Sequence, residues 1–78
     1  MTTPLVHEPS ALALTVNGDR RSVAPGTSLA AFLASLQLDP RMVVIEHNRT
    51  IVRDRAAYAA LVLEDGDVLE IVHFVGGG

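Results

Sequence analysis

The chain ends in three consecutive glycines, Gly76, Gly77 and Gly78, which directly follow the apolar stretch EIVHFV. A free α-carboxylate is ionised at neutral pH and is a poor electrophile, so it becomes an acyl donor only after activation, for instance by adenylation with ATP. Glycine suits a peptide end that must enter a narrow active site, because a backbone without Cβ can approach other groups closely. The ending predicts a carrier whose reactive atom is the terminal carbon of Gly78, and a leftover linker is the alternative explanation.

The other polar residues do not form a recognisable active site. His7, His47 and His73 lack the spacing of a metal-binding pair on a helix, and the chain has no Cys to act as a nucleophile or thiolate ligand. A catalytic carboxylate pair needs burial or repulsion between its charges to separate its pKa values. The polar, turn-rich segment EDGD is expected to be solvated and to provide neither. We therefore expect no enzyme activity, no metal site and no bound cofactor.

Two features near the end of the chain are candidates for partner binding. The first is acidic: Asp65, Asp67 and Glu70 could form an edge that docks an arginine-bearing protein. A solvated loop with surface charge is the simpler explanation of the same residues. The sequence leaves both interpretations of this acidic stretch open.

The second feature is an apolar patch beside the glycines. If Leu69 and Ile71 face the core, Val72 and Phe74 point the other way, because successive side chains of a strand alternate between faces. With Val75 they would form an exposed apolar patch, which often marks an interface. The alternative is that the alternation breaks and Phe74 covers the edge of the core.

Composition excludes several classes of partner. The 78 residues fit one small domain, and 49% of them are hydrophobic, which is enough for a globular core. The net charge is −3, with scattered Arg and no Lys, which argues against nucleic acid. No apolar stretch approaches membrane-spanning length, and the first ten residues lack the pattern of a signal peptide. Without Cys, a reducing compartment is favoured, so we expect a cytoplasmic protein, monomeric on its own.

A β-hairpin is predicted near the start of the domain. In ALALTVNGDRRSVA, the residues Leu12, Leu14 and Val16 alternate with Ala13 and Thr15, which is typical of a half-buried strand. The dipeptide Asn17-Gly18 then favours a tight turn, so residues 20–24 should pair back antiparallel.

One α-helix is predicted after the hairpin. Its apolar stripe has the spacing i, i+3, i+4 and i+7 and consists of Leu29, Phe32, Leu33 and Leu36. Thr27 or Ser28 would supply the N-cap oxygen, and Pro40 bars continuation beyond Asp39.

Residues 43–52 predict a second strand pair, with a turn at Asn48-Arg49. The segment RDRAAYAAL is typical of a short helical turn, EDGD of a tight turn with Gly66 at the permissive position, and DVLEIVHF of a long last strand. This order indicates an α+β fold of the β-grasp, or ubiquitin-like, class: a mixed five-stranded sheet whose first and last strands lie parallel at its centre, with one main helix on one face. A ferredoxin-like fold would need a second full helix.

The predicted organisation is a flexible lead-in at 1–10, the β-grasp domain at 11–74 and a flexible glycine tail at 75–78. This helix–sheet order, the turn EDGD, the strand VLEIVHF and the ending VGGG resemble the sulfur carriers of the ThiS family, from about Leu12 to Gly78. The lead-in is longer than is usual in that family, and RDRAAYAALVLEDGD is about one residue longer. Neither departure touches the tail.

The resemblance implies a function in thiamine biosynthesis. A ubiquitin-activating-like adenylyltransferase would use ATP to adenylate the Gly78 carboxylate, which would then become a thiocarboxylate and pass its sulfur to a thiazole synthase. A carrier for molybdopterin, cysteine or tRNA thiolation is the related alternative, although the molybdopterin subunit normally ends in two glycines after a proline-containing segment. A ubiquitin-like interaction module without reactive chemistry is the alternative from another class.

Overall fold

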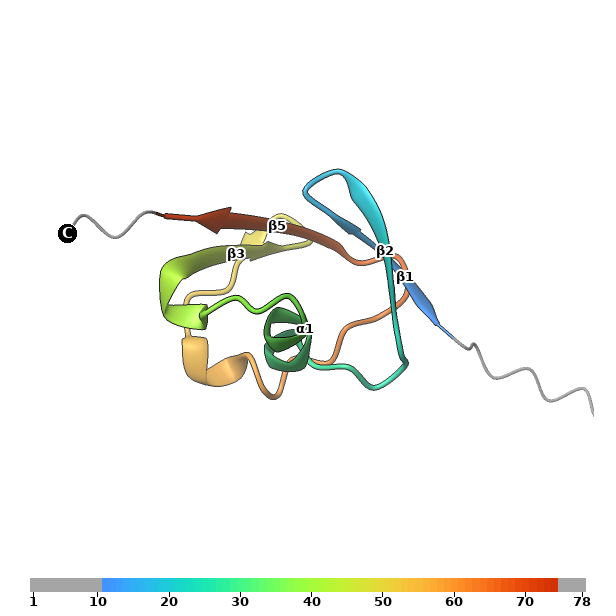
Figure 1. The fold of residues 1–78 in the computed structure, drawn as a ribbon, viewed down its shortest axis with the longest axis horizontal. Helices are drawn as coiled ribbons and strands as arrows, with labels where there is room; N and C mark the ends of the chain where they lie inside the picture. Colours follow the sequence, from blue (N-terminus) through green and yellow to red (C-terminus); the bar gives the residue numbers. More distant parts are fainter. Residues whose placement is uncertain (1–10, 75–78) are drawn as a thin grey trace, which may run out of the picture.

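A computed structural model describes residues 11–74, so the predictions made for 1–10 and 75–78 lie outside the described residues. Five strands form one mixed sheet, and one α-helix lies against one of its faces (Figure 1). The elements are β1 (Leu12–Val16), β2 (Asp19–Val23), α1 (Leu29–Ser35), β3 (Val43–His47), β4 (Thr50–Ile51) and β5 (Val68–His73), with short 3₁₀ turns at η1 (Pro40–Met42) and η2 (Arg55–Ala57).

Both predicted hairpins are present. Asn17 and Gly18 join β1 to β2 with φ angles of 51° and 85°, and Asn48 and Arg49 join β3 to β4 with 49° and 73°. Two successive residues with positive φ define the two-residue turn whose twist matches that of paired strands. Asn tolerates this conformation better than most residues, which explains why both turns were predictable from the sequence.

The strand order is β2-β1-β5-β3-β4, with β1 and β5 parallel at the centre. The backbone amide of Thr15 donates to the carbonyl of Asp67 at 3.0 Å, and that of Asn17 to the carbonyl of Leu69 at 2.9 Å. The first and last strands of the domain are therefore neighbours, and the predicted β-grasp arrangement is confirmed.

The helix begins as predicted but ends early. Ser28 is the N-cap, and its hydroxyl oxygen accepts a hydrogen bond from the amide of Ala31 at 3.0 Å. The helix stops at Ser35, well before Pro40, because Gln37 adopts a left-handed conformation with φ of 60°. The amide of Leu38 then donates to the carbonyl of Leu33, as in a Schellman cap.

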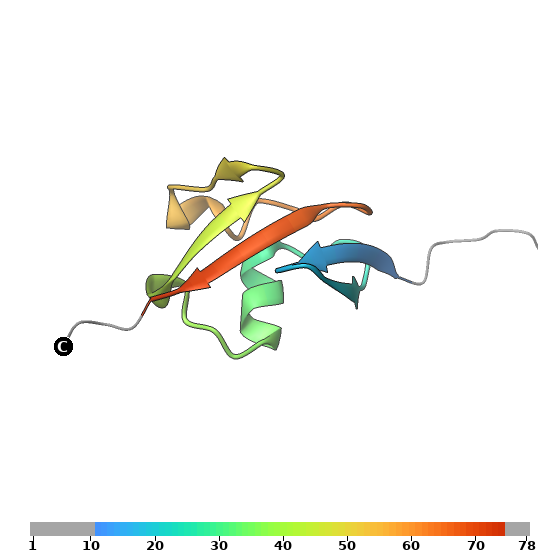
Figure 2. The ribbon, with the colours of Figure 1, turned by 90° about the horizontal axis from the view of Figure 1, so that it is seen from above.

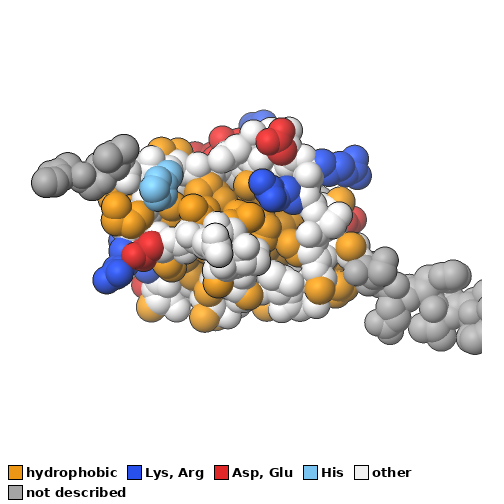
Figure 3. Space-filling view, in the orientation of Figure 1, with side chains coloured by type: hydrophobic (Ala, Val, Ile, Leu, Met, Phe, Trp, Pro, Cys, Tyr) orange, Lys and Arg blue, Asp and Glu red, His pale blue; other side chains and the backbone are white. Residues whose placement is uncertain are grey.

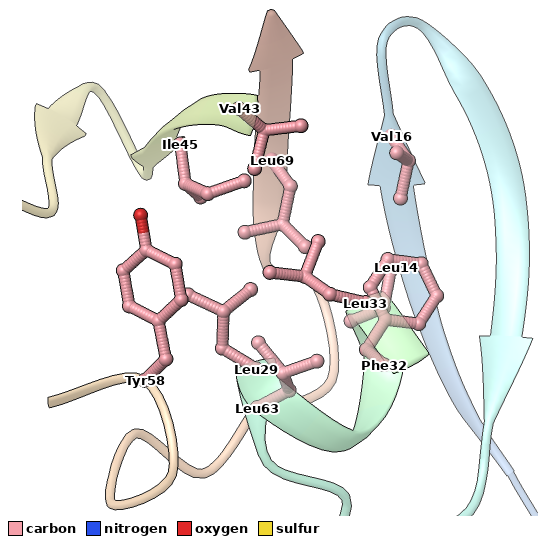
Figure 4. Packing of buried hydrophobic residues seen from close by; sticks show 10 residues of the cluster. All are labelled: Leu14, Val16, Leu29, Phe32, Leu33, Val43, Ile45, Tyr58, Leu63 and Leu69. Atoms are coloured by element: carbon pink, nitrogen blue, oxygen red, sulfur yellow. The ribbon is translucent and has the colours of Figure 1, made fainter. Parts of the chain in front are cut away.

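The core lies between the helix and the sheet (Figure 4). Its buried side chains come from every layer of the fold and are Leu14, Val16, Leu29, Phe32, Leu33, Val43, Ile45, Tyr58, Leu63 and Leu69. The predicted short helical turn in RDRAAYAAL is η2, which carries Tyr58 into the core with only 2% of its surface exposed. The Tyr58 hydroxyl lies 3.5 Å from the carbonyl oxygen of Val52.

Candidate functional site

Strand β5 leads directly to the tail, and it lies between β1 and β3 in the sheet. On the β3 side it pairs antiparallel from Leu69 opposite His47 to His73 opposite Val43. The strand ends at His73, one residue earlier than predicted, but the amide of Phe74 still donates to the carbonyl of Met42 at 3.1 Å. The sheet therefore holds the chain up to Phe74, immediately before the predicted tail.

The predicted alternation along β5 is confirmed. Leu69 is fully buried and Ile71 packs against the core, whereas Val72 is 60% exposed and Phe74 is 39% exposed. Val72 lies directly opposite Val44, which is 40% exposed. We call Val44, Val72 and Phe74 the outer patch, because they belong to the sheet face turned away from α1, which faces the viewer in Figure 2.

The sequence prediction included Val72 and Phe74 but missed Val44. The run VVI in β3 contained the necessary signal, because Val43 and Ile45 are buried and the residue between them must point outward. Whether the outer patch binds a partner stays a prediction, as does the role of Val75, which lies outside the described residues.

The acidic stretch does not form one solvated edge. Asp65 accepts a hydrogen bond from the amide of Ala13 at 2.7 Å through Oδ1, so it connects the turn before β5 to β1. Glu70 is exposed on the outer face, opposite Glu46. The expectation that Asp67 is a surface charge is wrong, because only 7% of the residue is exposed.

Asp67 is the buried centre of a polar group that we call the Asp67 cluster, formed with the partly exposed His47, the exposed Asn48 and the backbone of Glu64. Its Oδ2 accepts from the amide of Glu64 at 2.9 Å and lies 2.8 Å from His47 Nε2, while its Oδ1 accepts from Asn48 Nδ2 at 3.0 Å. Asn48 Oδ1 in turn accepts from the amide of Val68 at 2.8 Å. The cluster therefore ties the β3–β4 turn to the first residue of β5.

This environment favours the ionised carboxylate. Burial acts to raise the pKa of Asp67, but the hydrogen bonds from Asn48, from the amide of Glu64 and from His47 outweigh it and hold the pKa below the usual value of 3.8. Both oxygens of Asp67 are engaged within the chain, which leaves the carboxylate a structural role at the start of β5.

Asn17 fixes β5 from the other side. Its Oδ1 accepts from the amide of Ile71 at 2.7 Å, and its Nδ2 donates to the carbonyl of Ile71 at 3.1 Å. Because β1 ends at Val16, this side chain continues the β1–β5 pairing beyond the end of the strand. The sequence indicated Asn17 only as a turn residue.

Two open hollows accompany these strands. One, of about 350 Å³, lies between the β1–β2 hairpin and the end of α1 (Figure 3). Its walls are Val16, Asn17, Asp19, Arg21, Leu36, Leu38, Ile71 and His73. The other, of about 180 Å³, lies beside β4 and η2 and includes Ile51 and Tyr58. Neither contains a nucleophile paired with a base.

Within residues 11–74 no three His, Asp or Glu side chains are grouped so that they could hold a metal ion. None of the helices in that range is long and apolar enough to cross a membrane. The described residues hold β5 in place and expose the outer face of the sheet beside the end of this strand.

The chain is similar to proteins of thiamine biosynthesis. It is 50% identical over 46 residues to the sulfur carrier protein ThiS of Bacillus subtilis, covering 68% of that protein. It is also 40% identical to thiazole synthases of Magnetococcus marinus over 63 residues and of Paramagnetospirillum magneticum over 67 residues. The chain spans only about a fifth of the length of these two synthases.

The fold agrees with these similarities. The crystal structure of the thiamine biosynthesis protein ThiS from Geobacter metallireducens superposes with a TM-score of 0.72 at 33% identity, covering 86% of this chain and all of that one. The solution structure of the Geobacter protein gives a TM-score of 0.70. The model of the ThiS family matches residues 14–78, from β1 through the final glycine, and the chain therefore belongs to the ThiS family.

Proposed function

We propose that this protein is the sulfur carrier of thiamine biosynthesis and that the carboxylate of Gly78 carries the sulfur as a thiocarboxylate. The observation that supports this most directly is the family match, which extends over residues 14–78 and so includes all three glycines. The Bacillus subtilis relative, named a sulfur carrier protein, supports the same role.

The proposed chemistry has two steps on Gly78. In the first, an oxygen of the carboxylate attacks the α-phosphorus of ATP, pyrophosphate leaves, and an acyl adenylate forms. In the second, hydrosulfide attacks the carbonyl carbon, AMP leaves with the oxygen that it had bound, and the thiocarboxylate of Gly78 remains. This activation is needed because a carboxylate alone is a poor electrophile, and the adenylate supplies a good leaving group.

Two partners follow from this chemistry. A ubiquitin-activating-like adenylyltransferase would bind ATP and enclose the tail, and a thiazole synthase would receive the sulfur. Support for the second partner comes from the two thiazole synthases that contain a region 40% identical to this chain. The proposed adenylation consumes ATP, which supports a cytoplasmic location for the protein.

The structure suits a carrier because the strand before the tail is well fixed. β5 is hydrogen-bonded on both sides, by β1 and Asn17 on one and by β3 on the other. The chain is therefore held at a defined position up to Phe74, the residue before the proposed tail. Glycines 76–78 offer no side chain to block a narrow channel in a partner enzyme.

The first step is tested by ATP–pyrophosphate exchange. The full chain is incubated with its cognate adenylyltransferase, ATP and labelled pyrophosphate, beside a variant that lacks Gly78. We expect exchange with the full chain and none with the shortened one, because the attacking carboxylate would be displaced. If neither protein supports exchange with an active enzyme, the chain is an interaction module without reactive chemistry.

Docking through the outer patch is tested with the double variant Val72→Ser/Phe74→Ser. Both side chains are exposed, so the domain should stay folded while KM for adenylation rises roughly tenfold or more, the usual effect of removing central apolar contacts. Val62→Ser is the matched control, because Val62 is 53% exposed and lies outside β5. Unchanged kinetics in the folded double variant would contradict this role of the patch.

A further inference from the structure

Next to the outer patch, two carboxylates face each other across neighbouring strands. Glu46 of β3 lies directly opposite Glu70 of β5 in the antiparallel ladder, one row from the pair Val44–Val72. Both glutamates belong to the outer face, because their chain neighbours Ile45 and Leu69 are fully buried. We call Glu46 and Glu70 the glutamate pair.

The arrangement is unfavourable in the free protein. Directly opposite residues have Cβ atoms only about 5 Å apart, and like charges at such positions repel. Among residues 11–74 neither glutamate forms an ion pair. On the same face β2 carries Arg20, which a whole strand separates from β5, because Arg20 pairs with Thr15 and Thr15 with Val68. On the β4 side, Arg49 and Arg53 flank Ile51, the residue opposite Glu46, and neither forms an ion pair with a glutamate among the described residues. The two carboxylates are therefore available for an ion pair with a cation supplied by a partner protein.

We propose that the glutamate pair binds an arginine side chain of the adenylyltransferase that activates the tail, while apolar side chains of that enzyme cover the outer patch. This inference rests on the proposed function and adds the chemistry of the partner. One guanidinium has donors in a planar fork that can reach two carboxylates at once. Binding of that guanidinium would relieve the repulsion between Glu46 and Glu70.

The adenylyltransferase is the partner that charge complementarity favours. An enzyme that binds ATP must neutralise a triphosphate, and arginine and lysine side chains are the usual means. The tail must reach the α-phosphorus, so the carrier surface beside the tail faces this basic region. The glutamate pair lies on that surface, because Glu46 of β3 and Glu70 of β5 share the outer face of the sheet with Val72 and Phe74.

The test is the double variant Glu46→Gln/Glu70→Gln in the full chain, assayed with the cognate adenylyltransferase. The amides keep the size of the side chains and remove both charges. We expect KM for the carrier to rise roughly tenfold or more, with a much smaller change in kcat, and the salt dependence of kcat/KM to weaken. Direct calorimetric titration of the enzyme with each carrier should show the same loss of affinity.

Thermal unfolding gives a second, opposite readout. Because like charges across strands destabilise the free protein, the double variant should have a higher Tm than the wild type. A merely structural role of the glutamates would not combine a more stable carrier with a weaker complex. The matched control is Asp19→Asn/Glu64→Gln, which removes two negative charges elsewhere on the surface.

Three outcomes would overturn the inference. One is unchanged KM and affinity in the glutamate variant, with adenylation itself intact, which would leave the proposed function standing. The second is an equal loss in the control variant, which would show that only net charge matters. The third is a lower Tm that accounts for the weaker activity. If even the wild type is not adenylated, the proposed function fails, and this inference fails with it.

Discussion

Replacing Asp67 by asparagine should destabilise the domain although the two side chains have the same shape. Two donors approach different oxygens of Asp67, the amide of Glu64 at Oδ2 and Nδ2 of Asn48 at Oδ1. Asparagine has only one oxygen, so in either orientation its NH₂ group faces one of these donors. Asn48 cannot turn its own amide around without losing the bond from Val68 to its Oδ1.

The magnitude follows from the burial of residue 67, which is only 7% exposed. In the variant its NH₂ group would face a donor, and leaving a buried polar group unsatisfied costs about 1–3 kcal/mol. A loss of about 2 kcal/mol corresponds to a fall in Tm of roughly 8–16 °C for a domain of this size. Urea denaturation monitored by circular dichroism gives the free energy of unfolding, and a thermal scan gives Tm.

Glu64→Gln is the control for this experiment. It also converts an acid to an amide, in the same turn, but the Glu64 side chain is exposed, so its stability should stay within about 0.5 kcal/mol of wild type. If Asp67→Asn were as stable as Glu64→Gln, the Asp67 cluster would not hold the turn to β5, and our account of how β5 is positioned would be wrong.

Two further predictions concern the same strand. The folded state lowers the pKa of Asp67, so at acidic pH the unfolded chain binds more protons than the folded one. The ionised Asp67 therefore contributes its full stability above the unfolded pKa of about 4, and this contribution is lost as the pH falls through the lower folded pKa. Urea titrations from about pH 5 downward should show this loss as a difference in the free energy of unfolding between wild type and Asp67→Asn. The comparison removes the effect of Asp39, which titrates in both proteins and whose pKa the hydrogen bond from Arg41 lowers to about 2. Asn17→Gly keeps the positive φ of the turn but loses both bonds to Ile71, so the free energy of unfolding should fall by about 1–2 kcal/mol. Hydrogen exchange at the Ile71 amide should accelerate, and an unchanged exchange rate would contradict the role of Asn17.

The sequence predicted the elements whose signals are local. The positive φ values at Asn17 and Asn48, the cap at Ser28 and the alternation in β5 each depend on a few adjacent residues. The early end of α1 was missed because Gln37 takes the left-handed position, where glycine is the usual signal. These elements in order were sufficient to indicate the β-grasp fold.

The polar contacts that fix β5 depend on residues distant in sequence. Asp67 meets His47 and Asn48 across 20 and 19 positions, and Asn17 meets Ile71 across 54. No local pattern distinguishes these residues from ordinary turn formers. Asp67 in particular lies in a segment whose composition is typical of a solvated loop, and only the packed sheet shows that its carboxylate is buried.

The central claim is that Gly78 carries sulfur, and intact-mass measurement tests it most directly. The full chain is incubated with its adenylyltransferase, ATP and a sulfur source, beside the variant lacking Gly78. The account predicts a mass gain matching replacement of one oxygen by sulfur in the full chain, dependent on ATP and absent from the shortened chain. An unchanged mass under conditions in which the enzyme and sulfur source are shown to be active would contradict it.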